Sequence, residues 1–459
     1  RRMIPSPTTS PPSRPGRRRG GLLFRREARE LLWLAGPIVL SQLGGVGMNT
    51  TDTILVGPLG ADALAAVGLA SSLHTVMIMV CSGVLFGMSP LVSRAFGAGD
   101  RHECRHVLVQ GLWLAVLLSV PVFILNLVGG PLTRALRQPE AISVIAGDYM
   151  TALAWGVLPY LLFTAFRQFL EGMGLARAPM VITLIGLLLN LVVDPVLIYG
   201  IPGWVPAMGA AGSGWATTAV RWAMFAAMGI YVLRHPDLHP FRGVRFAPEG
   251  GLLRRIVGIG VPSGAQAGLE VGLFTFAAVM MGWIGAVELA AHQVTINIAA
   301  TTFMVALGVS IAGSIRVGQN LGAERPAGVR RAVLATYLFS VGFMALCALL
   351  FLAIPRGLIG LYTSDPAIIR VGVQLLFMAA LFQVFDGTQV AGFAVLRGAA
   401  DTRVPMLVAA LGYWAVGVPV AYLLAFHSSM GPVGIWAGLC VGLATAGLLL
   451  LRRVRRMLL

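Results

Sequence analysis

Twelve long apolar segments follow one another along this chain, and they limit its fold more than any other feature of the sequence. They lie at 31–56, 66–91, 107–129, 146–168, 179–200, 209–233, 255–281, 289–314, 331–354, 369–395, 404–426 and 432–451. A helix needs about 20 mostly apolar residues to cross the hydrocarbon core of a bilayer. The sequence therefore predicts an all-α, polytopic membrane protein with twelve transmembrane helices.

Charge is scarce, and arginine supplies nearly all of the positive charge. Only 11% of the 459 residues are charged, against about a quarter in soluble domains, and the chain contains no lysine. The net charge of +16 arises in short segments between the apolar stretches, which argues against nucleic acid as a partner. The four cysteines lie far apart and form no CxxC pair, so we expect neither a disulfide framework nor a metal site.

The distribution of arginine predicts the orientation of the chain. With the N-terminus in the cytoplasm, the arginines that fall outside are Arg134, Arg137, Arg356 and Arg370, and only Arg221 lies well inside a span. Cytoplasmic loops of membrane proteins carry an excess of Lys and Arg. We therefore expect both termini in the cytoplasm.

The two halves of the chain repeat each other at a shift of about 225 residues. Gly57–Ala66 aligns with Gly282–Ala291, and Gly172…Arg-Ala-Pro-Met180 aligns with Gly398…Arg-Val-Pro-Met406. Six spans per half is an even number, so the two copies have the same orientation in the membrane. We predict two six-helix lobes, arranged as parallel repeats about an axis along the membrane normal, with a cleft between them.

Composition and repeat together divide the chain into four parts. We expect a disordered, Arg- and Pro-rich cytoplasmic tail at 1–28, an N-terminal lobe at 29–234, a cytoplasmic linker at 235–253 and a C-terminal lobe at 254–459. The first apolar segment contains Asp52 and continues into the polytopic pattern. We therefore expect no cleavable signal peptide.

Four acids lie inside predicted spans, namely Asp52, Asp194, Glu270 and Asp386. A charged side chain at the bilayer centre costs at least about 2.5 kcal/mol on insertion scales, and no lysine is available as a partner. Such a carboxyl group is either kept neutral by a proton or balanced by a bound cation. These acids are candidate sites for a coupling ion or a cationic substrate.

Polar residues accompany the acids of the first half. Asn190 lies four residues before Asp194, so the two side chains share a helix face. With Asp52 they predict an oxygen-rich cation site, to which Thr217 is a weaker candidate ligand. The alternative is a structural contact between helices in which the amide and the carboxylates satisfy one another.

Amide side chains lie near the acids of the second half. Gln266 precedes Glu270 by four residues, and Gln293 and Asn297 share one face of the eighth span. We expect these three amides to support the acids of this half. His292, beside Gln293, is more typical of a hydrogen-bonded interior residue than of a proton relay.

Prolines mark the same depth in the first span of each half, at Pro37 and Pro262. A proline inside a helix removes one backbone hydrogen bond and favours a kink. We expect both helices to bend there when the protein changes conformation.

Motifs of nucleotide-driven pumps and of serine hydrolases are absent. The chain has no G-x-x-x-x-G-K-[ST] phosphate loop and no GxSxG pattern. An ion gradient is the remaining energy source that is compatible with acids inside the membrane. The sequence predicts a transporter that is not an enzyme and needs no cofactor.

Several short segments occur in the order and spacing of a known family. They include Asp52-Thr-Ile-Leu-Val-Gly57, Leu170-Glu-Gly-Met-Gly174, Glu288-Leu-Ala-Ala-His-Gln293 and Leu396-Arg-Gly…Asp401-Thr-Arg-Val-Pro-Met406. At these residues the chain resembles the multidrug and toxic compound extrusion family, and its NorM-type branch in particular. The resemblance covers roughly residues 25–455.

The resemblance implies a monomeric antiporter of the bacterial inner membrane that exports cationic and amphipathic drugs in exchange for Na⁺ or H⁺. Carried over residue by residue, Glu270 and Asp386 match the second-lobe cation site of NorM-type members. Asp52, Asn190 and Asp194 match the first-lobe polar cluster on which related branches rely. Either site is a candidate for coupling, and Na⁺ at the carboxylates is the only metal implied.

Two other functions compete with this interpretation. A flippase for a lipid-linked oligosaccharide precursor, in the same fold superfamily, would favour a cationic cleft for pyrophosphate, whereas acids predominate inside these spans. A passive channel requires neither the duplication nor isolated acids.

Overall fold

The computed structural model describes residues 17–236, 238–428 and 430–459, which form helices and loops without a β-strand. The first half contains α1 (Arg17–Val56), α2 (Ala61–Leu85), α3 (Met88–Gly97), α4 (Arg101–Leu127), α5 (Gly129–Ala135), α6 (Glu140–Ala154), α7 (Val157–Gly172), α8 (Arg177–Tyr199) and α9 (Gly209–Arg234). The second half contains α10 (Gly250–Ile284), α11 (Ala286–Gly322), α12 (Pro326–Ala353), α13 (Pro355–Gly360), α14 (Pro366–Gly398), α15 (Arg403–Ala409), α16 (Val418–Phe426) and α17 (Gly431–Leu458). The predicted all-α class is confirmed.

The number of membrane-crossing stretches agrees with the sequence. Within the described residues, eleven helical stretches are long and apolar enough to cross a bilayer, and the pair α6–α7, bent by 47°, makes a twelfth. The predicted span at 404–426 is not a regular helix, because a π-helical segment, Ala410–Gly417, joins α15 to α16. The twelve predicted spans are otherwise confirmed.

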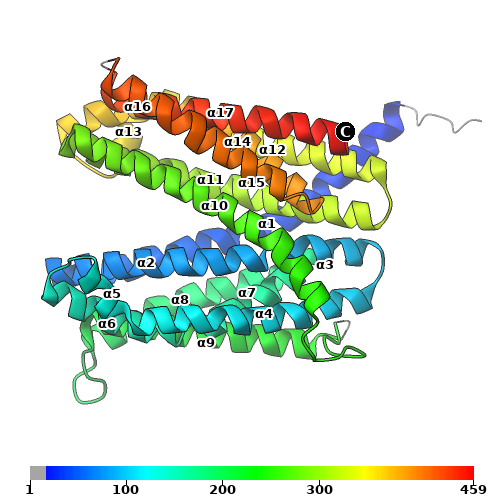
Figure 1. Cartoon of the computed structure of the whole chain (residues 1–459), viewed down its shortest axis with the longest axis horizontal. Coiled ribbons are helices and arrows are strands. Elements are labelled where there is room, and N and C mark those ends of the chain that lie inside the picture. Colours follow the sequence, from blue (N-terminus) through cyan, green and yellow to red (C-terminus); the bar gives the residue numbers. More distant parts are fainter. Residues whose placement is uncertain (1–16, 237, 429) are drawn as a thin grey trace, which may run out of the picture.

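The helices form two lobes, which we call the N-lobe (α1–α9) and the C-lobe (α10–α17) (Figure 1). Each lobe has its own apolar core. In the C-lobe, Phe382 packs edge-to-face on Trp436, with ring centroids 5.6 Å apart. The ribbons of the two lobes lie close together near α3 and diverge toward α6 and α13 (Figure 1).

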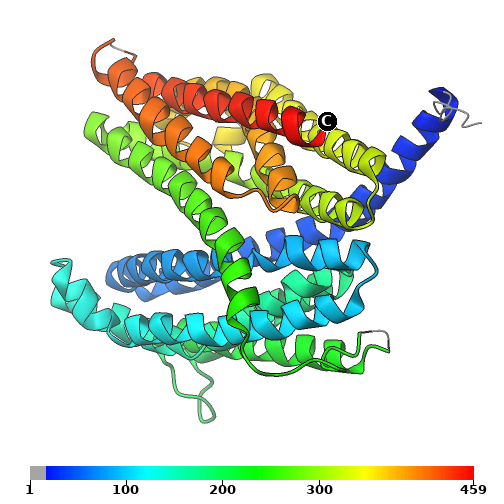
Figure 2. The same cartoon turned by 45° about the vertical axis from the view of Figure 1, so that its right-hand side comes forward.

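The first helix of each lobe begins against the opposite lobe. Leu31 of α1 is buried in one cluster with Ile315 of α11. Ile256 and Ile259 of α10 belong to the core of the N-lobe, and Figure 2 shows α10 passing from one lobe to the other. The boundary predicted at 254 therefore falls inside a helix that packs on both lobes.

The tail predicted at 1–28 is wrong in its C-terminal part. α1 begins at Arg17, and only 7% of the surface of Glu27 is exposed. The helix extends this far because Phe24 packs against a buried apolar cluster and Glu27 forms an ion pair with Arg316. Residues 1–16 lie outside the described residues.

The linker between the lobes lies against α4. The Gln110 side chain donates a hydrogen bond to the carbonyl of Ala247 (3.0 Å) and accepts one from the backbone N–H of Glu249 (2.8 Å). The indole N–H of Trp113 donates to the carbonyl of Phe246. These bonds attach the connection to the N-lobe just before α10 begins.

At one end of the molecule, the backbones of the two lobes touch. A Cβ atom on Gly83 of α2 would lie 2.3 Å from the Cα of Gly264 of α10. A Cβ atom on Gly97 of α3 would lie 2.0 Å from the carbonyl oxygen of Gln319 of α11. Only glycine permits such an approach. We call this the closed end, and the opposite end, with α5 and α13, the splayed end.

Candidate functional site

A cavity of about 430 Å³ lies between the two lobes. The N-lobe lines it with residues of α1, α2, α3 and α7, and the C-lobe lines it with α10, α11 and α14. Five phenylalanines contribute to the wall, and the charged lining residues are Arg167, Glu171, Glu270, Asp386 and Arg397. An apolar wall with a few charged groups is typical of a site for a small molecule.

The two acids predicted in the second half both line this cavity. Gln266 donates a hydrogen bond to Glu270, with Nε2 and Oε2 3.3 Å apart. Gln389 donates to Asp386, with Nε2 and Oδ1 3.0 Å apart. Each carboxylate therefore keeps an oxygen for a ligand, while one amide fixes its orientation.

The support of Asp386 extends to Tyr413, which the sequence did not indicate. The Tyr413 hydroxyl donates to Oε1 of Gln389 over 2.6 Å, and both side chains are fully buried. This bond leaves the amide N–H₂ of Gln389 to point at Asp386. Tyr413 lies in the π-helical segment, whose wider turns change which side chains face the core. Regular α-helical spacing along the sequence therefore does not predict that Tyr413 faces Gln389.

The acids predicted in the first half form a separate, buried cluster. Asn190 donates from Nδ2 to Oδ1 of Asp52 (3.1 Å) and to Oδ2 of Asp194 (3.0 Å). The Thr217 hydroxyl donates to Oδ2 of Asp52 (3.1 Å). The structure thus brings together all four predicted residues from α1, α8 and α9, but none of them lines the central cavity.

Arg221 lies one turn beyond Thr217 on α9 and continues this polar region. Its Nη1 lies 3.0 Å from Nε2 of His74, and its guanidinium stacks 5.0 Å from the ring centroid of Tyr160. Arginine only donates, so Nε2 of His74 accepts. The His74 proton is then on Nδ1, which donates to Oδ1 of Asn126 over 2.9 Å.

Three other polar residues of the second half lie away from the cavity. Gln293 and Asn297 are exposed and do not line the cavity. They share a face of α11 with Ala300, which does line it, but they lie nearer the start of that helix. The Asn297 side chain donates a hydrogen bond to the carbonyl of Gln293. His292 is buried and packs against Trp436, with ring centroids 5.8 Å apart. The support of the acids that we expected from Gln293 and Asn297 therefore comes instead from Gln389.

The two prolines lie inside continuous helices, α1 and α10. Both are close to contacts between the lobes. Pro37 is two residues before Val39, which touches Gly308, and Pro262 is two residues before Gly264 at the closed end.

Two arginines that we had assigned to the cytoplasmic side, Arg167 and Arg397, line the cavity. Arg167 is paired, with Nε 3.3 Å from Oε1 of Glu171 and Nη2 3.2 Å from Oε1 of Gln42. Glu171 and Arg397 occupy equivalent positions in the duplicated halves, immediately before Gly172 and Gly398. The internal repeat is therefore the sequence feature that could have indicated Glu171 and Arg397 as cavity residues.

The start of α4 carries an HExxH pattern, His102-Glu103-Cys104-Arg105-His106. In zinc enzymes this spacing places two histidines on one metal. Here the two rings lie 6.2 Å apart, His102 bonds the carbonyl of Gly243, and His106 pairs with Glu249. No group of three or more His, Cys, Asp or Glu side chains in the described part of the chain is arranged to hold a metal ion.

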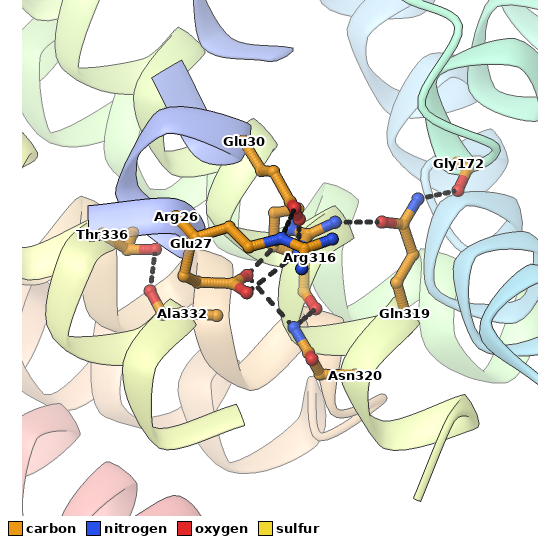
Figure 3. A network of polar contacts seen from close by, with 9 residues as sticks. All are labelled: Arg26, Glu27, Glu30, Gly172, Arg316, Gln319, Asn320, Ala332 and Thr336. Carbon is orange, nitrogen blue, oxygen red and sulfur yellow. Dashed lines mark hydrogen bonds and ion pairs between the residues drawn. The ribbon is translucent and has the colours of Figure 1, made fainter. Parts of the chain in front are cut away.

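A network of polar contacts joins the lobes at the closed end (Figure 3). Arg316 of α11 contacts Glu27 and Glu30 of α1, and its Nε lies 2.8 Å from Oε1 of Glu27. Gln319 donates to the carbonyl of Gly172 (3.1 Å), and Asn320 donates to Glu27 (3.1 Å). Separating the lobes at the closed end therefore requires breaking the ion pair between Arg316 and the buried Glu27.

Two duplicated lobes of membrane-crossing helices around a charged cavity define this protein as a polytopic transporter. The model of the MatE family matches residues 37–196 and 262–423, one stretch in each lobe. The chain therefore belongs to the MatE family, the multidrug and toxic compound extrusion family.

Relatives of the chain extend over nearly its whole length. A probable multidrug resistance protein NorM of Mesorhizobium japonicum is 38% identical over 444 residues, which is 95% of each chain. A multidrug resistance protein NorM of Burkholderia vietnamiensis is 36% identical over 432 residues, 93% of each chain. A solved outward-facing conformation of a multidrug resistance MATE family transporter matches with a TM-score of 0.86 at 21% identity, covering 96% of this chain and 98% of that one. The structural match shows the same fold.

Proposed function

We propose that this protein is a secondary active antiporter that exports cationic and amphipathic drugs in exchange for Na⁺ or H⁺. The observation that carries the proposal is the pair of carboxylates, Glu270 and Asp386, in the wall of a largely apolar cavity between the lobes. The names of the relatives, which are multidrug resistance proteins, support the same class of substrate.

The exchange follows from competition for the same carboxylates. Oxygen atoms of Asp and Glu bind hard cations such as Na⁺ and also accept protons, and they attract organic cations by charge. When Glu270 and Asp386 hold the ion, the cavity has less negative charge for the drug. When they hold the drug, the ion is displaced, so the two are carried in opposite directions.

We assign this competition to the C-lobe because its two acids line the cavity, whereas Asp52 and Asp194 do not. The N-lobe cluster has a different property that supports binding of a proton or cation. Oδ1 of Asp194 and Oδ1 of Asn190 are buried and have no hydrogen-bond partner in the described structure. We propose that this cluster binds a second proton or cation without contact with the drug.

The orientation follows from the charge at the closed end. The loops and helix ends there carry Arg94, Arg101, Arg255 and Arg325. Arginine-rich ends face the cytoplasm. We propose that both termini are cytoplasmic, that the protein lies in a bacterial inner membrane as a monomer, and that the described conformation admits ligands from the outside.

Transport by the purified protein in liposomes tests the proposal. Ethidium and norfloxacin export is measured with a Na⁺ gradient and a pH gradient imposed separately. We expect one gradient to drive export in the wild type, and neither to do so in Asp386→Asn. Gln138, a half-buried neutral residue that does not line the cavity, provides the control variant Gln138→Asn. Full export by Asp386→Asn would sink the assignment of this carboxylate.

The flippase alternative predicts a different result in the same assay. A pyrophosphate-linked lipid requires a strongly cationic cavity, whereas this one has three carboxylates and two arginines, of which Arg167 is already paired. Export of neither drug under either gradient, by correctly inserted protein, would favour the flippase.

A further inference from the structure

Arg397 is one of the two arginines that line the central cavity. Its side chain is half-buried, and within the described residues it makes no hydrogen bond and no ion pair. Its guanidinium lies 5.8 Å from the ring centroid of Phe86, across the boundary between the lobes. The other cavity arginine, Arg167, is occupied by Glu171 and Gln42.

The donors of Arg397 are not used by other side chains of the described structure. Arg397 lines the cavity, and none of its nitrogen atoms is among the fully buried side-chain atoms that lack a hydrogen bond. A guanidinium presents five N–H donors in a planar fork that matches a carboxylate. The cavity thus offers a built position for an anionic group.

This position is separated from the acids by apolar wall. Asp386, Val390, Phe393 and Arg397 line the cavity from one face of α14. Asp386 and Arg397 are eleven residues apart, which is about 16 Å along a helix axis, and a long side chain in a helix points back toward the N-terminus of that helix, which here is the direction of Asp386. A ligand that reaches from one to the other needs an apolar body with opposite charges at its ends.

An anionic group that reaches Arg397 pairs with it in a setting with little water, where charged pairs are stronger than in bulk solvent.

We propose that Arg397 recognises the anionic group of zwitterionic, amphipathic substrates, whose cationic group binds at Glu270 and Asp386. This inference rests on the proposed function and names a substrate class for the same cavity. Arg397 binds the carboxylate through two parallel N–H donors, and Phe86 and Phe393 contact the apolar body between the charges.

A matched pair of ligands tests this assignment on the purified full-length protein. Norfloxacin carries a cationic amine and a carboxylate, whereas its methyl ester carries the amine alone. Equilibrium binding of both is measured by ligand fluorescence for the wild type, Arg397→Gln and Arg397→Lys. The control variant is Arg403→Gln, because Arg403 is exposed on the same lobe and does not line the cavity.

We expect Arg397→Gln to weaken norfloxacin binding by about tenfold or more, because a bidentate charged pair is lost, and to weaken ester binding by less than about threefold. Arg397→Lys should restore part of the loss, since lysine keeps the charge without the fork. Arg403→Gln should leave both affinities as in the wild type.

Equal losses for norfloxacin and its ester in Arg397→Gln would overturn the inference, as would no loss for either. Retained ester binding shows that the variant is folded. If the wild type binds ethidium and the ester, but Arg397→Gln binds norfloxacin as tightly as the wild type does, this inference alone fails. If the wild type binds none of the three, the proposed function fails as well.

Discussion

Arg316 of α11 and Glu27 of α1 form an ion pair between the lobes, with Nε and Oε1 2.8 Å apart. Glu27 has only 7% of its surface exposed, so its charge depends on this partner. The pair lies at the closed end, where Arg316 also contacts Glu30 (Figure 3). Opening of the closed end must therefore separate these two residues.

Arg316→Met should shift the protein toward the conformation in which the closed end is open. Removing one partner leaves Glu27 buried without its counter-charge, which costs about 3 kcal/mol, or roughly a hundredfold change in the ratio of conformations. Spin labels at Trp204 and Leu361, which are 88% and 80% exposed at the splayed end of each lobe, report the shift. We expect their separation to shorten.

The matched control is Arg26→Gln. Arg26 is exposed and, among the described residues, forms an ion pair only with Glu30, over 3.0 Å. Exposed pairs contribute at most about 1 kcal/mol. Identical label separations in Arg316→Met, Arg26→Gln and the wild type would show that the ion pair does not hold the closed end.

Gly83→Ala should also weaken the closed end, for a steric reason. The new Cβ would lie 2.3 Å from the Cα of Gly264, and backbone cannot move aside as a side chain can. We expect a cost of about 1–3 kcal/mol, seen as a lower Tm and as the same shortening between labels. Gly68→Ala on the same helix is the control, since nothing lies within 4 Å of a Cβ there. A normal Tm for Gly83→Ala would contradict the close packing.

The sequence predicted those features of the site that depend on regular helices. Asn190 and Asp194 share a face at four-residue spacing, and the cost of a carboxylate in the membrane singled out Asp52, so the structure brings the three together. The twelve spans followed from the length of the apolar segments. The apolar length of a segment and the spacing of residues along a helix can both be determined from a single sequence.

Residues whose position depends on tertiary packing were missed. Arg397 follows the last apolar residue of its span, which is typical of a cytoplasmic arginine, and only the packing of α14 against α3 places it over the cavity. Glu27 belonged to an Arg-rich segment that favours disorder, and its order comes from a partner 289 positions away. Such contacts depend on which helices pack together in the folded protein, and local composition does not predict that packing.

Tyr413→Phe should reduce the affinity for the coupling ion. Loss of the hydroxyl leaves Oε1 of Gln389 buried without a donor, so the amide that orients Asp386 is free to turn. We expect about a tenfold increase in the half-saturating ion concentration, since an unsatisfied buried group costs about 1–3 kcal/mol. Drug affinity measured without the ion should change less.

Tyr422→Phe is the control for this change, because Tyr422 is exposed and its hydroxyl makes no hydrogen bond with the described residues. An unaltered ion dependence in Tyr413→Phe would mean that Asp386 is held by other contacts.

Asn190→Leu should destabilise the N-lobe. The amide is a shared donor to Asp52 and Asp194, and without it both carboxyl groups lose a buried hydrogen bond. We expect a loss of about 2–4 kcal/mol in the free energy of unfolding, measured by thermal unfolding in detergent. Asn297→Leu changes an exposed amide and should cost no more than about 0.5 kcal/mol. Equal effects of the two variants would indicate that the cluster adds nothing to stability.

Pro37→Ala should slow transport while it strengthens the helix. Proline lacks the N–H that would bond the carbonyl four residues earlier, so α1 is weakest just before Val39, which packs against Gly308 of the other lobe. Restoring the hydrogen bond stiffens the segment that must bend when the lobes exchange contacts, and hinge changes of this kind alter turnover. We expect export to be slower by about threefold or more, with drug affinity close to the wild type.

Pro121→Ala provides the comparison, because Pro121 is also inside a helix, α4, but is exposed and away from the contacts between the lobes. Its export rate should equal that of the wild type. Pro262→Ala should behave like Pro37→Ala, since Pro262 has the equivalent position beside Gly264 in the second lobe. Transport at the wild-type rate in both Pro37→Ala and Pro262→Ala would mean that the lobes move as rigid bodies about the closed end, with no bend in α1 or α10.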